Sequence, residues 1–240
     1  ASMLGYNVLI TTSNAHDISE LQSLVESNRV DGMLLTRALE DDRALQYLSQ
    51  ANFPTALTGT CRYDNIIQVD TDNEGAAEKM TTLLIGKGFR RFAFLVKDMS
   101  YNVDRKRHEG FCRALIKNGI SEKDQLFYNG SIRMEFLDAI IENIISKKVE
   151  CIICGDDEIC TMVMSRLQAE GYRIPKDVAI ASLYNSTNLD CYSPAVTAVS
   201  VAASQMGGTA VRQLIQRLRG ENYEKKTMLD YDILFRKSTN

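Results

Sequence analysis

The chain alternates between apolar, β-prone runs and stretches with helical spacing from one end to the other. Within runs such as residues 31–36 and 91–96 the apolar residues are consecutive rather than alternating, which is typical of parallel strands that are covered on both faces. Glycines such as Gly88, Gly119 and Gly171 stand just after helix-like stretches, where a left-handed cap is expected. This alternation predicts a doubly wound α/β fold.

The expected elements follow from this alternation, and the length suits one large domain or two lobes of about 100–120 residues each. A chain of 240 residues buries roughly 70–75% of its unfolded surface, so it needs no disulfide or metal to fold. We expect strands at residues 7–12, 31–36, 54–59, 65–69, 91–96, 125–129, 150–154, 177–184 and 228–235, and helices at 18–28, 40–51, 73–87, 104–118, 134–147, 157–170 and 204–219.

Composition and charge exclude several classes of function. The net charge is -3 and no basic stripe is present, so this chain by itself is not expected to bind nucleic acid. No apolar run is long enough to cross a membrane, and the N-terminus carries no signal-peptide pattern.

The six cysteines lie mostly within apolar runs, where a free thiol packs as a small hydrophobe. This pattern fits a reducing cytoplasm better than a disulfide-rich secreted protein. The sequence Cys151-Ile-Ile-Cys154 lies in a strand-like run, so its two thiols are expected on opposite faces of a sheet. We therefore favour buried thiols over a zinc or redox site.

Residues 69–78, "VDTDNEGAAE", resemble the start of a calcium-binding loop. An EF-hand loop needs a bidentate glutamate at its twelfth position, and that position is Thr81 here. We instead expect Thr71 to Glu74 to form a capping box that begins the next helix, so no metal site is predicted.

Several stretches carry short motifs in one order: "VDTDNEGAAEKMTTLLIGKGFRRFAFL", "RKRHEGFCRALIKNGI", "CGDDEICTMVMSRLQAEGYRIPKDVAIASLYN", "SPAVTAVSVAASQMG" and "ILFRKST". Together they resemble the effector domain of the LacI/GalR family of bacterial transcription regulators. The resemblance covers about residues 5–240. The family's helix-turn-helix, hinge helix, first strand and first helix are not visible before Gly5.

The resemblance implies a periplasmic-binding-protein-like type I fold, with two similar lobes joined by three crossovers and a ligand cleft between them. The N-terminal lobe would comprise residues 1–70 and 201–229, and the C-terminal lobe residues 71–200 and 230–240. It also implies a cytoplasmic homodimer that binds a small-molecule effector, a sugar or another small metabolite, and that reaches operator DNA only through a helix-turn-helix outside this chain. No cofactor, catalytic residue or membrane contact is expected.

In open α/β sheets, ligands bind beyond the carboxyl ends of the strands. This rule indicates Thr58, Tyr101, Arg107, Asp156, Tyr184 and Asn185, together with Asp70 and Asp72, for which we favour hinge support. By their position, Val103 and Ile132 are expected to line the cleft, although core packing explains them equally well.

Arg107 is the strongest candidate for a ligand contact. The apolar stripe of the helix at 104–118 passes through Leu115 and Phe111, and one turn earlier it reaches Arg107. The resemblance implies a ligand-binding arginine here, which can form bidentate hydrogen bonds to hydroxyls or a carboxylate. The alternative is a structural ion pair with Asp104 or Asp156.

The remaining candidates point away from a simple sugar. Asp156 stands where the family commonly has a ligand-binding asparagine, although a helix cap explains it as well. Tyr184 and Asn185 replace a pair of acids, and Gly59 stands where relatives often carry an aspartate. The resemblance implies that two acids that bind sugar hydroxyls in relatives are absent here. The ligand could therefore be an amino acid, a nucleoside, a modified sugar or a phosphate rather than a simple sugar.

We therefore expect a regulator's effector-binding and dimerisation domain rather than an enzyme. A periplasmic binding protein of the same fold is the alternative, and the regulator-like motifs and six cysteines argue against it. A nucleotide-dependent enzyme ranks third, because no G-x-G-x-x-G motif follows a strand.

Overall fold

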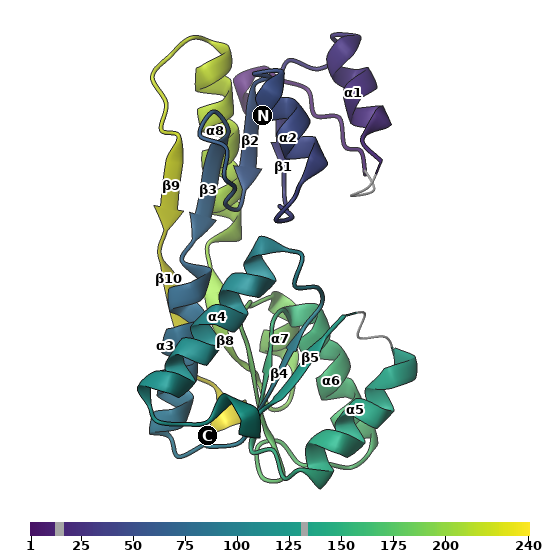
Figure 1. The fold of residues 1–240 in the computed structure, drawn as a ribbon, viewed down its shortest axis with the longest axis vertical. Coiled ribbons are helices and arrows are strands. Elements are labelled where there is room, and N and C mark those ends of the chain that lie inside the picture. The colour runs from purple at the N-terminus through teal and green to yellow at the C-terminus, as the bar shows by residue number, and fades with distance from the viewer. Residues whose placement is uncertain (13–16, 131–133) are drawn as a thin grey trace. The chain divides into compact units, whose positions relative to one another are not determined.

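The computed structural model describes residues 1–12, 17–130 and 134–240 and divides them into two compact units (Figure 1). The first unit contains Ala1–Thr71, Ser100–Asn102 and Ala202–Leu229, and the second contains Asp72–Met99, Val103–Val201 and Asp230–Asn240. The α/β class with parallel sheets is confirmed. Ser100–Asn102 was not expected in the first unit. This short segment binds there through main-chain hydrogen bonds, such as Asn102 N–H to Ala38 O at 3.1 Å.

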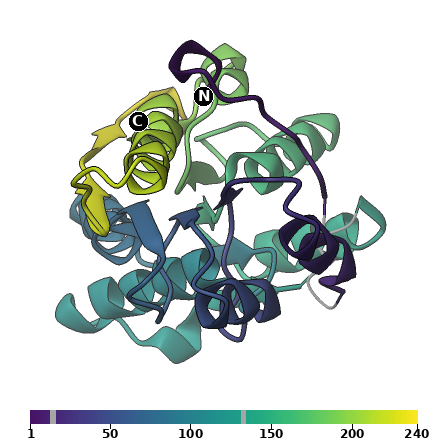
Figure 2. The same cartoon turned by 90° about the horizontal axis from the view of Figure 1, so that it is seen from above.

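The first unit is built on a four-stranded parallel sheet in the order β1-β2-β3-β9. One face packs on α8 through residues such as Ala56 and Leu214, and α1 and α2 pack on the other, which can be followed in Figure 2. The elements are η1 (Ser2–Leu4), α1 (Ser19–Glu26), β1 (Met33–Leu35), α2 (Arg43–Gln50), β2 (Thr55–Thr58), β3 (Ile67–Thr71), α8 (Ala203–Leu218) and β9 (Lys226–Leu229).

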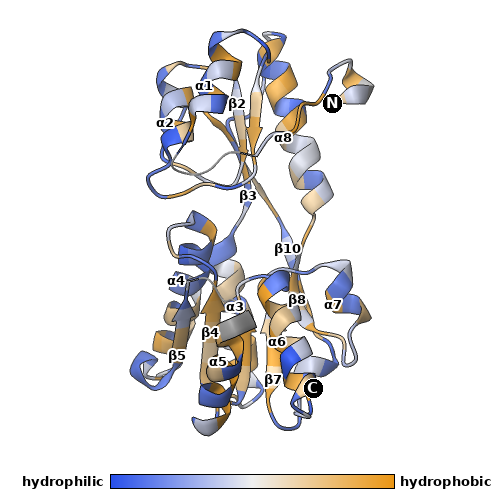
Figure 3. Ribbon diagram, turned by 90° about the vertical axis from the view of Figure 1, so that its right-hand side faces the viewer, coloured by the Kyte–Doolittle hydropathy of each residue, from blue (hydrophilic) through white to orange (hydrophobic). Residues whose placement is uncertain are grey.

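The second unit is built on a six-stranded sheet in the order β10-β8-β7-β6-β4-β5, in which only the β10–β8 pair is antiparallel. Two of its strands, β4 and β7, are hydrophobic ribbons in Figure 3. The elements are α3 (Asn73–Gly86), β4 (Phe92–Val96), α4 (Asn102–Lys117), η2 (Glu122–Asp124), β5 (Leu126–Asn129), α5 (Met134–Ser146), β6 (Cys151–Cys154), α6 (Asp157–Ala169), β7 (Ala179–Ser182), α7 (Thr187–Cys191), β8 (Thr197–Val201), β10 (Tyr231–Leu234) and η3 (Lys237–Thr239).

Each face of this second sheet is covered by its own pair of helices. Alternate strand residues such as Leu95 and Ile152 pack against α5 and α6, whereas Phe94 and Ile153 pack against α3 and α4. Because both faces are buried, the central strands are apolar at every position, as the sequence indicated.

Residues 7–12 were predicted as a strand, and the structure shows no strand there. Val8, Leu9 and Ile10 are exposed, Ile10 by 87%. A strand needs a neighbour for its hydrogen bonds, and no strand of the described residues pairs with this segment. Its apolar sequence was therefore not sufficient to predict its conformation.

Other differences concern the chain near the boundaries between units. The predicted strand at 228–235 is two strands, β9 and β10, which belong to different sheets and are separated at Asp230. The strand β8 was missed, because its sequence "TAVSV" mixes polar and apolar residues. The capping box was also wrong by one residue: α3 begins after Asp72, whose Oδ1 accepts the N–H of Gly75 at 2.8 Å.

All six cysteines are free. Cys151 lies in the core beneath α3 and α4, and Cys154 lies beneath α5 and α6, so the two side chains do point to opposite faces. No group of metal-ligating side chains is found among the described residues. No described helix has the length and apolar character that crossing a bilayer requires.

The packing of α4 on α3 leads to a prediction about Gly110. A Cβ atom there would press on the main-chain oxygen of Glu74 and lie 3.0 Å from Cβ of Ala77. We expect Gly110→Ala to lower the free energy of unfolding by about 1–3 kcal/mol through overpacking. Urea denaturation followed by circular dichroism measures the change.

Gly86→Ala is the matched control, since Gly86 is also helical and a Cβ there meets nothing within 4 Å. That variant should gain up to about 1 kcal/mol from helix propensity. Equal stability of the two variants would show that the helices do not approach closely at Gly110.

The cysteines differ in their expected reactivity toward a thiol reagent such as Ellman's reagent. Cys191 is exposed and should react first. Burial raises the pKa of Cys112 to about 11, which lowers its thiolate fraction and slows it at pH 8. The buried Cys151, Cys154 and Cys160 should react only after denaturation. Rapid reaction of four or more thiols in the native protein would contradict this packing.

Candidate functional site

The carboxyl ends of three neighbouring strands meet at one edge of the second unit's sheet. The segments that leave β4, β6 and β7 begin at Lys97, Gly155 and Leu183. Ligand sites in open α/β sheets form at this kind of edge, because the helix N-termini and loop side chains converge there. The candidates Arg107, Asp156, Tyr184 and Asn185 come from the elements around it.

Arg107 is buried, with only 7% of the residue exposed. It lies in the second turn of α4 on the same face as Phe111, and that face packs on the sheet. Its Nη1 donates a hydrogen bond of 2.7 Å to the main-chain oxygen of Gly155, just beyond the end of β6. A buried guanidinium needs hydrogen-bond acceptors, and the main-chain oxygen of Gly155 is one of those that Arg107 has at this edge.

Asp156 caps the N-terminus of α6, which is the structural role that the sequence offered as an alternative to ligand binding. Its Oδ1 accepts the N–H of Ile159 at 2.8 Å, and its Oδ2 lies 3.1 Å from Nζ of Lys97. Lys97 also pairs with Glu158. Both carboxylate oxygens of Asp156 therefore already have donors within the protein, and a ligand contact by Asp156 stays a prediction.

Tyr184 and Asn185 lie in the loop after β7 and are half-buried. The hydroxyl of Ser182 donates to the main-chain oxygen of Tyr184 at 2.6 Å, which fixes the start of the loop. The Oδ1 of Asn185 accepts a hydrogen bond of 2.8 Å from Nη1 of Arg236. Orienting the amide oxygen toward Arg236 leaves the NH2 of Asn185 as the group that can donate.

Arg236 is a residue that the sequence reasoning missed. It also donates to the main-chain oxygen of Val196 at 2.6 Å and pairs with Asp190, so it connects the chain after β10 to both ends of the 184–196 segment. The only sequence signal was its place in the closing motif "ILFRKST". Its partner in the candidate site is about fifty residues away in sequence, at Asn185.

Two other candidates lie in the first unit. Thr58 is the half-buried last residue of β2. Tyr101 forms an isolated antiparallel bridge with Leu39, and the guanidinium carbon of Arg37 lies 5.5 Å from the centroid of its ring. This ring contact is a cation–π interaction, which holds Tyr101 against the segment before α2.

The remaining predicted residues have mixed outcomes. Val103 is half-buried in the second unit, and Ile132 lies outside the described residues. Asp70 is 8% exposed, and its Oδ1 accepts the N–H of Thr71 at 2.8 Å. Asp70 and Asp72 flank the point where the chain passes from one unit to the other, so a hinge role for them stays a prediction.

Comparison with known proteins identifies relatives of this arrangement. Residues 81–239 match the periplasmic binding protein-like domain family. The HTH-type transcriptional regulator CelR of Thermobifida fusca is 26% identical over 237 residues, which cover 96% of this chain and 70% of that protein.

Solved structures give the same result. A LacI transcriptional regulator structure from Bacillus cereus subsp. cytotoxis is 28% identical, with a TM-score of 0.90 and coverage of 99% of this chain and 86% of that one. The CelR–cellobiose complex is 26% identical, with a TM-score of 0.80 and coverage of 91% and 69%. The chain therefore belongs to the periplasmic binding protein-like domain family, and it is the effector-binding part of a LacI-type transcription regulator.

Proposed function

We propose that the effector binds at the carboxyl ends of β4, β6 and β7 and that Arg107 is its main polar contact. The observation that carries this proposal is the buried guanidinium beside Gly155, at the edge where open α/β sheets bind ligands. Arg107 presents donors in a fixed plane, which suits a carboxylate, a phosphate or a pair of hydroxyls.

The candidate residues favour an effector that supplies hydrogen-bond acceptors. Arg107 offers only donors, and the amide of Asn185 has its oxygen on Arg236. Asp156 is a carboxylate, but it is engaged by Lys97 and the N-terminus of α6. The similarity to the CelR–cellobiose complex supports a sugar or a sugar derivative, and the absent acids at Gly59 and Tyr184 favour a modified sugar or another small metabolite.

In the full-length regulator, we propose that this domain dimerises in the cytoplasm and controls a separate DNA-binding segment. Binding of the effector to this domain would change operator affinity by a coupling free energy of about 1–3 kcal/mol. Asp70 and Asp72 would support the hinge. The relatives are named as transcription regulators, which favours this function over small-molecule transport and over catalysis.

Arg107→Lys tests the main contact, because lysine keeps the charge and loses the planar pair of donors. A thermal-shift screen of sugars, sugar phosphates, amino acids and nucleosides on the unmodified protein first identifies a ligand. Calorimetry should then show that Arg107→Lys binds this ligand at least about tenfold more weakly, as expected for the loss of a bidentate charge-assisted contact.

Arg113→Lys is the matched control, since Arg113 lies on the same helix and pairs with Glu74 on the surface. It should change affinity by less than about twofold. Circular dichroism checks that both variants stay folded. If the folded Arg107→Lys protein bound the ligand as tightly as Arg113→Lys, the effector would have to contact other residues.

A further inference from the structure

The second unit has a pocket at the opposite edge of its sheet from the candidate effector site. It is lined mainly by the segments that lead into β4, β6 and β7, which contribute residues 87–89 and 91, 148–150 and 175–177. These strands are neighbours in the sheet, so the three connections converge at its amino end. The cavity volume is about 490 Å³, within the range of small-molecule sites.

Positive charge gathers at this pocket, although the chain as a whole is acidic. Lys87, Arg91, Lys148 and Lys176 contribute four positive charges, and Glu150 and Asp177 contribute two negative charges. The lining therefore carries a net charge of +2, compared with -3 for the whole chain. A concave surface with one sign of charge raises the local concentration of ions of opposite sign.

The two acids of the pocket are already bound by groups of the protein. Glu150 Oε2 accepts the main-chain N–H groups of Arg90 and Arg91 at 2.6 and 3.1 Å, and its Oε1 accepts Nη2 of Arg91 at 3.0 Å. Glu150 therefore holds Arg91 at the pocket instead of neutralising the lysines.

Asp177 is held in the same way by an arginine next to the pocket. Arg173 donates to it from its main-chain N–H, Nε and Nη2 at 2.8–2.9 Å. These hydrogen bonds lower the pKa of Asp177 to about 2. The carboxylate therefore stays ionised and bound to Arg173 at neutral pH.

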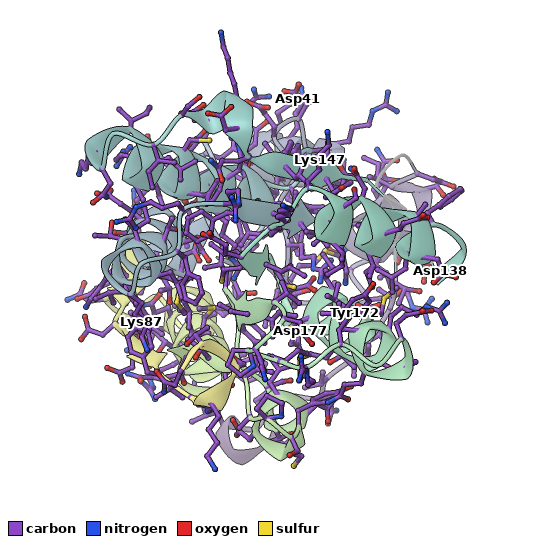
Figure 4. The ribbon with its side chains drawn as sticks, turned by 90° about the horizontal axis from the view of Figure 1, so that it is seen from below. Asp41, Lys87, Asp138, Lys147, Tyr172 and Asp177 are labelled. Carbon is purple, nitrogen blue, oxygen red and sulfur yellow. The ribbon has the colours of Figure 1, made fainter. Side chains whose placement is uncertain are left out.

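Two lysines of the pocket are not held in this way, although the charge of Lys176 adds to the lowering of the Asp177 pKa. In the described part of the chain, the ammonium groups of Lys148 and Lys176 form no ion pair and no hydrogen bond with the protein. Lys87 is anchored at the rim, where its ammonium donates to the main-chain oxygen of Thr239 at 3.3 Å and lies 4.9 Å from the centroid of the Phe235 ring. Figure 4 views this end of the second unit, with Lys87 and Asp177 labelled.

The pocket also has apolar walls. Phe89, Ile145 and Pro175 are half-buried parts of its lining, and Val149 is buried behind them. A ligand that fits must therefore combine a strongly anionic group with a small carbon body. Lysine ammonium groups bind phosphate as compact point charges, and Arg91 adds a planar donor group.

We propose that this pocket binds a small phosphate monoester, with Lys148 and Lys176 as its main contacts with the phosphate. The site is separate from the effector site, because it lies at the amino ends of the strands and uses none of the same residues. An occupied pocket would join the connections before β4, β6 and β7 through one shared anion, which gives the regulator a second place to sense a charged metabolite.

Phenyl phosphate is a suitable probe, with inorganic phosphate and phenol as comparison compounds. Titrations of the isotope-labelled protein, followed by amide NMR shifts, should show saturable changes at residues 87–91, 148–150 and 175–177. Phenyl phosphate should bind more tightly than inorganic phosphate because of the apolar walls, and phenol should not bind. Sodium chloride should weaken the binding of both phosphates.

The double variant Lys148→Gln/Lys176→Gln should bind phenyl phosphate at least about tenfold more weakly, as expected when two cationic partners of a phosphate are lost. Lys147→Gln is the matched control, because Lys147 is exposed beside Lys148 and does not line the pocket. It should change affinity by less than about twofold. Figure 4 labels Lys147 on the same side of the molecule.

Three results would overturn the proposal. In the first, neither phosphate compound shifts the amide signals of the pocket residues. In the second, Lys147→Gln weakens binding as much as the double variant does. In the third, the shifts appear at residues 97–98, 155–158 and 184–185, which would place the phosphate in the effector site. Thermal denaturation of each variant excludes unfolding as the cause of lost binding.

Discussion

The parallel ladder of β4, β6 and β7, buried on both faces, is the constraint on which the rest of the second unit depends. Its strands are fully covered by α3 and α4 on one face and by α5 and α6 on the other. Because parallel strands must each be followed by a crossover, all connections of one kind gather at one edge. The carboxyl edge holds Arg107, Asp156 and Asn185, and the amino edge holds the cationic pocket.

The close packing of α4 on α3 determines the direction of the Arg107 side chain. Gly110, less than one turn after Arg107, allows the two helices to approach until the main-chain oxygen of Glu74 occupies the space of a side chain. Phe111 then stacks on Phe94 with ring centroids 4.7 Å apart. Helix packing of this closeness leaves little freedom for α4, and Arg107 is therefore directed toward Gly155 rather than toward solvent.

Much of the fold was predictable from the sequence, because buried strands and amphipathic helices differ in their apolar spacing. The errors have physical causes. Residues 7–12 are apolar but have no described strand to pair with, and β8 contains the polar Thr197, which is buried because its hydroxyl is hydrogen-bonded to that of Thr239. Asp230 separates two strands that belong to different sheets, although the sequence around it reads as one continuous strand.

The candidate site shows the same division. The spacing of Arg107, Phe111 and Leu115 in the sequence predicted an arginine on a buried helix face, and the expected strand ends indicated Asp156, Tyr184 and Asn185. Only the tertiary structure showed that Asp156 is engaged by Lys97, that Arg236 orients Asn185, and that three loops bring Lys87, Lys148 and Lys176 to one pocket. Local spacing determines which face of an element a side chain occupies, whereas its partner is decided by segments that are distant in sequence and meet only when the sheet is assembled.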